Sequence, residues 1–457
     1  MKQVFFFIQF IFSISAFAQV DTTTNLSDKE KIVGLSKFWS EAANNFVYFD
    51  QAKINWDSAY EAFIPKVLAS KSKWEYYNIL KQFAALLKDG HTDVQEPSSL
   101  YNSPSQSRYK FINIENVNKH FYVTNIDKSD QEKVPLGSEL IKINEIPLIT
   151  YLQRNMFPYL SASTDEQLWN DAARFMFYGT DSAQRWKLDL KTPSGIFISY
   201  NAYFHTYPRN WEIAIPHWQR TTYKKIDNIG YFQINTFGDE HVIDDFKKIL
   251  PELRACKAVI LDIRYNGGGN SEIGAEILKY FKDTRILIGS KWQARENISA
   301  FKAWGAGLLD KNYDSLSDFD KICVQDYKGE YWYQGDTMQF DNNIKEAKII
   351  TPLVVLIGNN TASAAEDFLI ILSNLNKRAI TVGQVTFGST GQPLSFDLPG
   401  GGSARICAKK DTYPNGKEFV GYGIKPDIVV IKNINDIISG KDVELEEAIK
   451  EINIRIK

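Results

Sequence analysis

One serine, Ser363, stands where a protein could present a nucleophile. An apolar run, residues 352–357, leads through a turn into an apolar segment that is expected to be a helix from Ala364 onward. A helix start offers unpaired backbone N–H groups and the positive end of the helix dipole, so negative charge developing on a substrate oxygen beside Ser363 would be stabilised there. The alternative is structural, because Ser363 followed three residues later by Glu366 also matches a capping box.

A glycine-rich turn upstream could supply hydrogen-bond donors to the same reaction. Residues 258–263 form a continuous apolar run, typical of a strand covered on both faces, and three glycines follow at 267–269. Such glycines let the backbone turn sharply and bring N–H groups close to a ligand. A dinucleotide-binding G-x-G-x-x-G fingerprint is excluded, because Glu272 occupies the third glycine position. An ordinary tight turn is the alternative.

His91 has the clearest setting for proton transfer. Ser72 and Glu75 predict the capping box of a helix, and Gly90 is placed to end that helix. His91 would then lie just past a helix C-terminus, where the dipole favours the imidazolium form that a proton acceptor must reach. At such a position a histidine is otherwise an ordinary surface or capping residue.

Five segments, in this order, resemble the C-terminal-processing peptidase family of serine peptidases, also called tail-specific proteases, including its tricorn-core branch. They are residues 89–92, 230–234, 261–269, 361–366 and 421–427. The resemblance implies an α/β fold with a spiral ββα catalytic core of the type shared with Clp proteases and crotonases. It also implies that Ser363 is the nucleophile and that the N–H groups of Gly268 and Ala364 hold the oxyanion.

The same resemblance bears on the catalytic base. One branch of the family pairs its serine with a lysine in a Gly-Lys-Gly setting, but the matching segment here, residues 386–391, carries Ser389 and no lysine. The tricorn-like branch uses a histidine instead, and His91 matches it. We therefore expect Ser363 to work with His91 as its general base, with an acid limb of the rate near pH 6 to 7, the range of an ordinary histidine.

The residues around that histidine depart from the tricorn-like pattern. That pattern places a serine before the histidine and a glutamate just before the terminal G-x-x-P-D motif, and Gly90 and Val420 occupy these positions here. Glu418 lies two residues from Val420, on the same face of a strand at a different height. It is therefore the candidate orienting acid.

Composition and targeting signals narrow the class further. A net charge of −2 gives no electrostatic footprint for nucleic acid or an anionic membrane surface. Residues 1–18 have the charged start, short apolar core and Ala16-Phe17-Ala18 site of a signal peptide, so we expect a periplasmic or secreted protein without a membrane span. Cys256, Cys323 and Cys407 cannot all pair and are expected as buried free thiols. No metal site and no cofactor are expected.

Three regions are expected from the pattern of the chain after that signal. Residues 19–104 are expected to form an N-terminal helical domain whose helices end at the histidine. Residues 105–205 form a β-rich module whose segment 137–144 resembles a PDZ domain. The peptidase core is expected over residues 206–457, and its aromatic-rich insert, residues 289–346, would form either a lid over the site or ordinary core.

These features predict an exported serine endopeptidase that cleaves unfolded or tail-exposed protein substrates through an acyl-enzyme on Ser363. Two alternatives remain on the same fold. A non-catalytic protein that binds apolar ligands would suit the aromatic insert, as in the interphotoreceptor retinoid-binding protein, which resembles this fold. A peptide-binding pseudoprotease would suit the missing lysine and the Val420 replacement.

Overall fold

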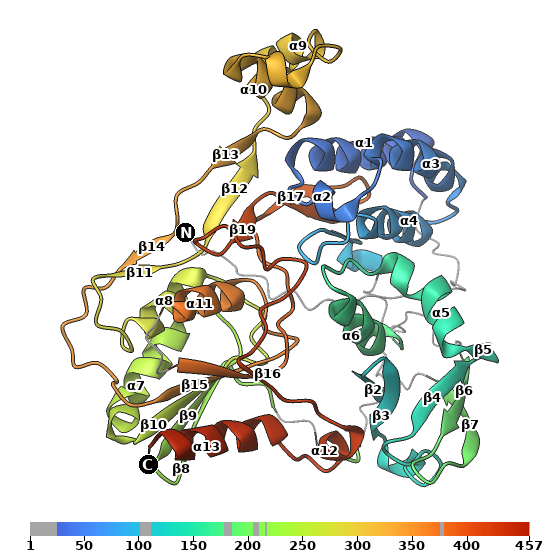
Figure 1. Ribbon diagram of the computed structural model, residues 1–457. Helices are drawn as coiled ribbons and strands as arrows, with labels where there is room; N and C mark the ends of the chain where they lie inside the picture. The colour runs from blue at the N-terminus through green and yellow to red at the C-terminus, as the bar shows by residue number, and fades with distance from the viewer. Residues whose placement is uncertain are drawn as a thin grey trace.

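The computed structural model describes residues 25–100, 111–177, 185–203, 210–214, 217–374 and 379–456 (Figure 1). The expected signal peptide, residues 1–18, lies outside these ranges. Within them the chain has a mixed α/β fold, and no helix there combines the length and the apolar character that a membrane span requires. All three cysteines are buried free thiols, as expected.

Four helices form the N-terminal part: α1 (Asp28–Asn45), α2 (Phe49–Ala52), α3 (Trp56–Ala69) and α4 (Lys73–Ala85). Helix α1 begins with a complete capping box, in which Ser27 Oγ accepts a hydrogen bond from the Glu30 N–H and the Glu30 carboxylate accepts one from the Ser27 N–H. The apolar faces of these helices pack into the largest core cluster of the molecule.

Helix α4 ends earlier than the sequence predicts. Ser72 caps its start by accepting from the Glu75 N–H, but its last residue is Ala85, and Lys88 rather than Gly90 takes a left-handed backbone, with φ 52°. His91 therefore lies in a separate turn and not directly at the end of the helix. The dipole argument for a charged His91 loses its basis, because the effect is confined to the last turn.

Residues 112–203 form a β-rich module with its own core. Its antiparallel sheet has the order β2-β3-β4-β6-β7, with β5 added beside β4. The elements are β2 (Ile112–Val117), β3 (His120–Ile126), β4 (Glu139–Ile143), β5 (Ile146–Pro147), α5 (Leu148–Asn155), α6 (Asp165–Phe175), β6 (Arg185–Lys191) and β7 (Phe197–Tyr203). Glu145, which stands where a turn glycine is usual, adopts the left-handed conformation itself, with φ 67°.

A six-stranded sheet forms the centre of the C-terminal half, in the order β20-β16-β15-β10-β9-β8. Its strands are β8 (Thr221–Ile226), β9 (Ile229–Ile234), β10 (Ala258–Asp262), β15 (Leu353–Ile357), β16 (Ala379–Gly383) and β20 (Ile428–Val429). All neighbours are parallel except β8 and β9. Because β10 and β15 are parallel neighbours, the glycine-rich turn after β10 and Ser363 after β15 emerge at the same edge of the sheet.

Helices cover both faces of this sheet (Figure 1). Helices α7 (His241–Ala255), α8 (Ser271–Leu278) and α11 (Ala364–Ser373) share a core cluster with Val259 and Leu261 of β10. On the other face, Ile260 of β10 packs in a cluster with helix α13 (Val443–Arg455), and the short helix α12 (Ile434–Ile438) precedes α13. Burial on both faces explains why the central strands are continuous apolar runs.

A small second sheet joins the N-terminal helices to this half. Strand β1 (Asp93–Gln95), which follows directly on the His91 turn, pairs antiparallel with β18 (Ser403–Cys407), and β18 pairs with β17 (Pro393–Asp397). The core cluster is continuous from the N-terminal helices through β18 to α11. This shared core brings His91 to the C-terminal half of the chain.

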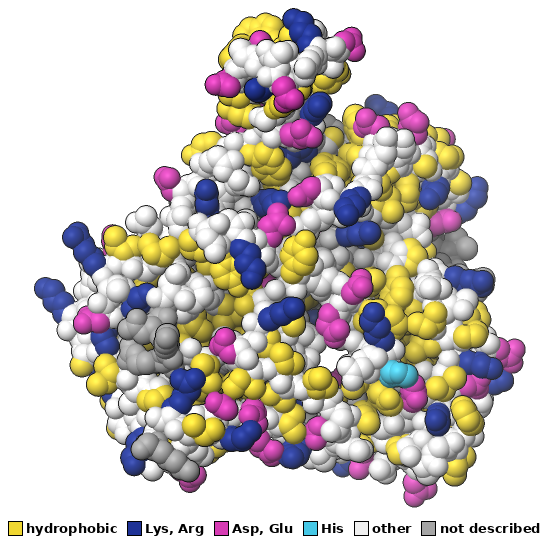
Figure 2. Space-filling model, viewed as in Figure 1, with side chains coloured by type: hydrophobic (Ala, Val, Ile, Leu, Met, Phe, Trp, Pro, Cys, Tyr) yellow, Lys and Arg dark blue, Asp and Glu magenta, His cyan; other side chains and the backbone are white. Residues whose placement is uncertain are grey.

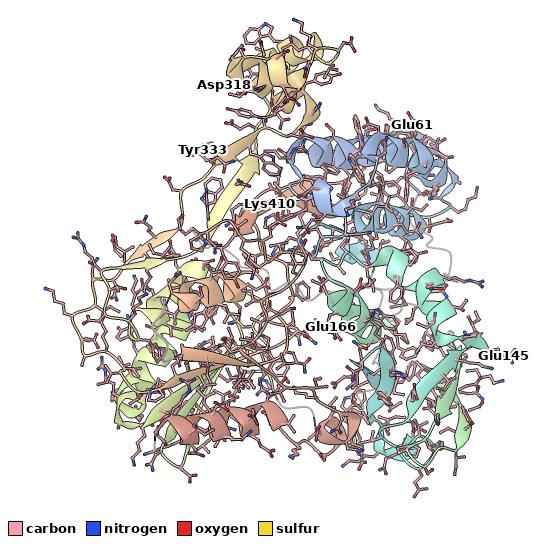
Figure 3. All side chains as sticks on the ribbon, in the orientation of Figure 1. Glu61, Glu145, Glu166, Asp318, Tyr333 and Lys410 are labelled. Atoms are coloured by element: carbon pink, nitrogen blue, oxygen red, sulfur yellow. The ribbon has the colours of Figure 1, made fainter. Side chains whose placement is uncertain are left out.

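The aromatic-rich insert forms a β-ribbon with two helices at its tip. The ribbon and its tip consist of β11 (Ile286–Ile288), β12 (Lys291–Arg295), α9 (Ser299–Ala306), α10 (Asp318–Lys328), β13 (Trp332–Gln334) and β14 (Gln339–Asp341), with β11 pairing β14 and β12 pairing β13. Strand β19 (Lys410–Thr412), from a later part of the chain, also pairs with β12. The tip, marked by Asp318, stands away from the main body (Figure 3). Its aromatic rings contact one another: the ring centroids of Trp304 and Phe319 are 5.6 Å apart, and both side chains are about half exposed.

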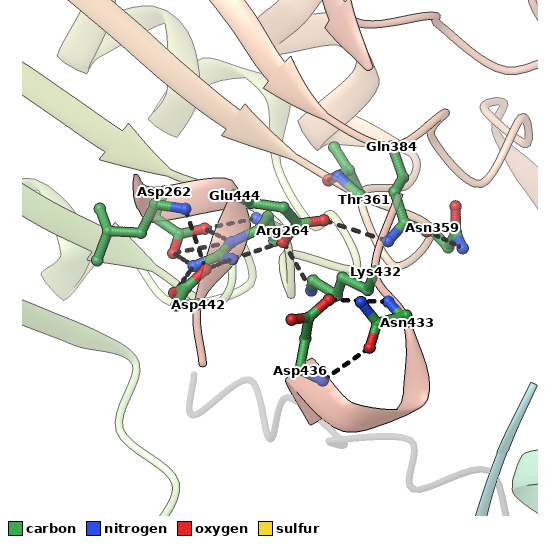
Figure 4. Close-up of polar contacts among 12 residues, drawn as sticks. Asp262, Arg264, Asn359, Thr361, Gln384, Lys432, Asn433, Asp436, Asp442 and Glu444 are labelled. Atoms are coloured by element: carbon green, nitrogen blue, oxygen red, sulfur yellow. Dashed lines mark hydrogen bonds and ion pairs between the residues drawn. The ribbon is translucent and has the colours of Figure 1, made fainter. Parts of the chain in front are cut away.

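Arg264, at the end of β10, anchors the start of the glycine-rich turn (Figure 4). Its guanidinium donates hydrogen bonds to Asp262 (2.7 Å), to Asp442 (2.7 and 2.8 Å) and to Glu444 (2.6 Å). Asp262 and Glu444 are fully buried, and Arg264 nearly so. The network ties β10 to the start of α13.

Replacing this arginine should destabilise the fold strongly. Arg264→Met leaves the buried Asp262 without its cationic partner, whereas Glu444 keeps Lys432 at 2.6 Å. Breaking a buried ion pair in this way costs about 3–5 kcal/mol of the free energy of unfolding. Urea denaturation measures the loss. Lys450→Met is the matched control, because Lys450 pairs with Glu447 at the surface, and little change is expected there. Equal stability of the two variants would contradict a structural role for Arg264.

Candidate active site

Ser363 stands at a strained turn between β15 and α11. Its backbone has φ 56° and ψ −125°, a region that residues with a side chain rarely adopt. The side chain makes no capping hydrogen bond, and the Glu366 N–H donates to the Ser363 carbonyl oxygen at 2.7 Å. The capping-box alternative is therefore wrong, and the hydroxyl is directed elsewhere.

The hydroxyl of Ser363 faces His91. The distance from His91 Nε2 to Ser363 Oγ is 3.2 Å, and the other ring nitrogen, Nδ1, lies 2.6 Å from Ser389 Oγ. The structure thus brings together two predicted site residues that are 272 positions apart in the sequence. It adds Ser389 as the partner of the second nitrogen.

Hydrogen bonds from two regions hold the His91 turn. The Thr92 hydroxyl donates to the buried Asp89 carboxylate at 2.6 Å. Ser163, just before α6 of the β-rich module, accepts from the Gly90 N–H at 2.9 Å and donates to Asp89 at 3.3 Å. The absence of a serine at position 90 is therefore accompanied by a serine that reaches the same turn from another part of the chain.

The surroundings of His91 favour the neutral imidazole. Burial lowers the pKa of His91 to about 3, and the positive charges of Arg405 and Lys409 act in the same direction. A neutral ring can accept a proton at the nitrogen that carries none. His91 is therefore in the protonation state that a general base requires at rest.

Glu366 holds the loop that carries Ser389. This fully buried carboxylate accepts hydrogen bonds from the N–H groups of Gly388 (2.9 Å) and Ser389 (3.0 Å) and from the hydroxyls of Thr386 (2.5 Å) and Thr390 (2.8 Å). Burial raises the pKa of Glu366 to about 7, and these four donors oppose the rise because they favour the ionised form. One carboxylate thus fixes four residues of the loop.

The glycine-rich turn lies against Ser363. A Cβ at Gly268, whose φ is 99°, would be 2.6 Å from the Ser363 Cβ and 3.0 Å from the Ala364 nitrogen, so only glycine fits. Two hydrogen bonds join the turns: Thr361 Oγ1 donates to the Ile263 carbonyl at 2.8 Å, and the Ala362 N–H donates to the Asn266 carbonyl at 3.0 Å.

The two predicted oxyanion donors differ in their present partners. The Gly268 N–H donates to Asn266 Oδ1 at 3.0 Å, so a substrate oxygen would have to displace an internal acceptor. Ala364 is the first residue of α11, where the N–H has no partner within the helix. The amide nitrogen of the buried Asn266 side chain has no hydrogen-bond partner in the described part of the chain.

Glu418 does not lie at His91 in the way the sequence suggests. Its carboxylate is 2.8 Å from the Lys410 ammonium at the foot of the β-ribbon, where Figure 3 labels Lys410. Val420 is buried in the hydrophobic core. The hydroxyl of Ser389 occupies the place at Nδ1 that an orienting acid would take.

The sequence does not reveal the contacts that Ser389 and Glu366 make at the site. Ser389 is noticeable as the residue at the lysine position, but nothing in the sequence places it against His91. The spacing of Glu366 from Ser363 predicts a local capping interaction. It does not predict that the Glu366 carboxylate bonds a loop that begins twenty residues downstream. No group of three or more metal-ligating side chains occurs among the described residues.

Two family models match separate parts of the chain. Residues 228–430, from β9 to β20, match peptidase family S41, and residues 28–85, helices α1 to α4, match the tricorn protease C1 domain. The first match contains Gly268, Ser363 and Ser389. His91 lies between the two matches.

Curated relatives are C-terminal-processing proteases. The chain is 32% identical over 143 residues to the carboxy-terminal-processing protease of Bartonella bacilliformis, covering 31% of this chain and 32% of the relative. It is 25% identical over 228 residues to CtpB of Bacillus subtilis, covering 49% of this chain and 38% of the relative. The matches thus span less than half the length of these relatives.

Among solved structures, mature CPAF is similar over nearly the whole chain. The TM-score is 0.71 at 15% identity, with 94% of this chain and 98% of CPAF covered. At this identity the likeness concerns the fold. Residues 228–430 are thus similar to peptidase family S41, and this match together with the C-terminal-processing relatives supports a serine-type peptidase.

Proposed function

We propose that the protein is an exported serine endopeptidase that hydrolyses peptide bonds with Ser363 as nucleophile and His91 as general base. The observation that carries the proposal is the 3.2 Å contact between Ser363 Oγ and His91 Nε2, made on a strained turn between a strand and a helix. A serine that only capped the helix would need neither the strain nor the histidine.

The chemistry follows from this contact. Ser363 Oγ attacks the substrate carbonyl carbon while His91 Nε2 takes up the hydroxyl proton. Collapse of the tetrahedral intermediate breaks the C–N bond, and the imidazolium returns the proton to the leaving amine. A water molecule, deprotonated by the same nitrogen, then hydrolyses the acyl-enzyme and restores Ser363.

The oxyanion of each tetrahedral intermediate would be held by the N–H groups of Gly268 and Ala364. Their closeness to the serine supports this assignment, since the Gly268 position borders both Ser363 Cβ and the Ala364 nitrogen. In this account the Gly268 N–H exchanges Asn266 Oδ1 for the oxyanion, so the donor is kept satisfied until charge develops.

The substrate class and location belong to the same proposal. The relatives' names and the predicted signal peptide support cleavage of unfolded or tail-exposed proteins outside the cytoplasm. The β-rich module is proposed to be PDZ-like and the core to be of the spiral ββα type. The face in view carries positive and negative side chains interspersed, without a basic stripe (Figure 2).

A covalent label separates this enzyme from a non-catalytic binder on the same fold. A fluorophosphonate should modify the purified protein at Ser363, located by mass spectrometry of the digested adduct. Ser363→Ala should abolish labelling, and Ser373→Ala, at the other end of the same helix, should not alter it. Absence of labelling in the folded wild-type protein would favour the binder.

Loss of either member of the pair should be comparably severe. Ser363→Ala and His91→Ala should each lower turnover by about four to six orders of magnitude, and the double variant by little more, because the two groups act as one unit. Hydrolysis of an activated p-nitrophenyl ester measures this. If His91→Ala keeps more than about a tenth of wild-type turnover, the base is another residue.

His91 should stay neutral where an ordinary histidine becomes charged. Its lowered pKa, about 3, means that acidification from about pH 8 to about pH 5 adds no proton. His241 is the internal control, since the Asp239 carboxylate 2.7 Å from its Nδ1 raises its pKa and it should become charged over this range. Imidazole NMR shifts, assigned with His91→Gln, measure both residues.

The lowered pKa of His91 also bears on the acid limb of the pH–rate profile that the sequence predicts. A limb between about pH 6 and 7 cannot belong to His91 if its pKa is about 3. A His91 resonance that moves together with that of His241 would show that burial does not hold the ring neutral.

A further inference from the structure

We propose that Ser389 is the positioning residue of His91 and that Glu366 holds it in place, so that a serine hydroxyl takes over the orienting role of a catalytic acid. The inference rests on the proposed roles of Ser363 and His91. It assigns a function to the residue that stands at the lysine position of the other branch and to a buried carboxylate that the peptidase chemistry does not otherwise use.

The two contacts of the imidazole determine its tautomer. Nε2 faces Ser363 Oγ and must carry no hydrogen if it is to accept the hydroxyl proton. The hydrogen of neutral His91 therefore resides on Nδ1, and its partner is Ser389 Oγ, 2.6 Å away. Since Ser389 is fully buried, water does not compete for this hydrogen bond.

Ser389 is also fixed relative to the nucleophile. Its carbonyl oxygen accepts a hydrogen bond from the Ser363 N–H at 3.0 Å, while its own N–H donates to Glu366 at 3.0 Å. Glu366 lies on α11, one turn beyond Ser363. The nucleophile, the base and the positioning hydroxyl are therefore connected through one helix start and one loop.

The hydrogen-bond inventory at Glu366 requires a carboxylate. Each of its two oxygens accepts from one backbone N–H and one threonine hydroxyl. A glutamine would turn its own NH₂ group toward either the Gly388 or the Ser389 N–H, and those two donors cannot satisfy each other. Glu366→Gln is therefore expected to release the loop although the side-chain shape is kept.

A serine hydroxyl differs from a carboxylate because it carries no charge, and this difference determines how much kcat falls when the group is removed. It orients the ring but brings no charge to balance the imidazolium, and loss of the orienting acid costs about ten-thousandfold in a Ser-His-Asp triad. The Glu366 carboxylate accepts from the Ser389 N–H and makes no hydrogen bond with the imidazole. Loss of the Ser389 hydroxyl should therefore cost less, about ten- to a hundredfold in kcat.

The test compares Ser389→Ala with Ser373→Ala. Both remove one serine hydroxyl, but Ser373, at the exposed end of α11, donates to the Ile370 carbonyl and contacts neither His91 nor Glu366. With an activated p-nitrophenyl ester, Ser389→Ala should lower kcat by about ten- to a hundredfold with little change in KM. Nitrogen-15 NMR should show the Nδ1–H tautomer of His91 in the wild type and in Ser373→Ala, and a mixture of tautomers in Ser389→Ala.

Each result decides the matter. Unchanged kcat in Ser389→Ala, or an unchanged tautomer, overturns the positioning role, as does an equal tautomer shift in Ser373→Ala. Glu366→Gln gives a second reading: it should lower both kcat and the melting temperature, and full activity would remove Glu366 from the account. If the wild-type protein is not labelled at Ser363, the proposed function itself fails; if it is labelled and Ser389→Ala matches it, the inference alone fails.

Discussion

The site depends on one buried carboxylate. Glu366 accepts four hydrogen bonds from residues 386–390, and this loop in turn places Ser389 against His91 and against the Ser363 backbone. Since Glu366 lies in the first turn of α11, directly after the nucleophile, the position of α11 determines the position of the loop. An isolated buried carboxylate would be costly, and the four donors are what make it tolerable.

Long-range packing determines the remaining geometry. Parallel pairing of β10 and β15 places the glycine-rich turn beside Ser363, and the Arg264 network holds the start of that turn to α13. His91 reaches the same place only because β1 pairs with β18 and the N-terminal helices share the main core. The pair therefore requires the N-terminal and C-terminal parts of the chain to fold as one body.

Local patterns in the sequence predicted the local parts of this structure. The apolar runs at β10 and β15, the start of α4 at Ser72 and the buried thiols are confirmed, because each follows from nearby residues. The prediction that α4 ends at Gly90 was wrong. The helix ends at Ala85, and Lys88 takes the left-handed conformation that glycine usually adopts. The Ser389 contact and the Glu418 ion pair depend on which loops meet in space, and spacing along one chain does not contain that information.

The structure of a covalent phosphonate adduct would show both the residue that attacks and the groups that hold the oxyanion. We expect phosphorus bonded to Ser363 Oγ, one phosphonyl oxygen within hydrogen-bond distance of the Gly268 and Ala364 nitrogens, and His91 Nε2 beside the serine oxygen with Nδ1 still on Ser389. An adduct on another residue, or a phosphonyl oxygen directed away from the glycine-rich turn while Asn266 keeps the Gly268 N–H, would contradict the proposed mechanism.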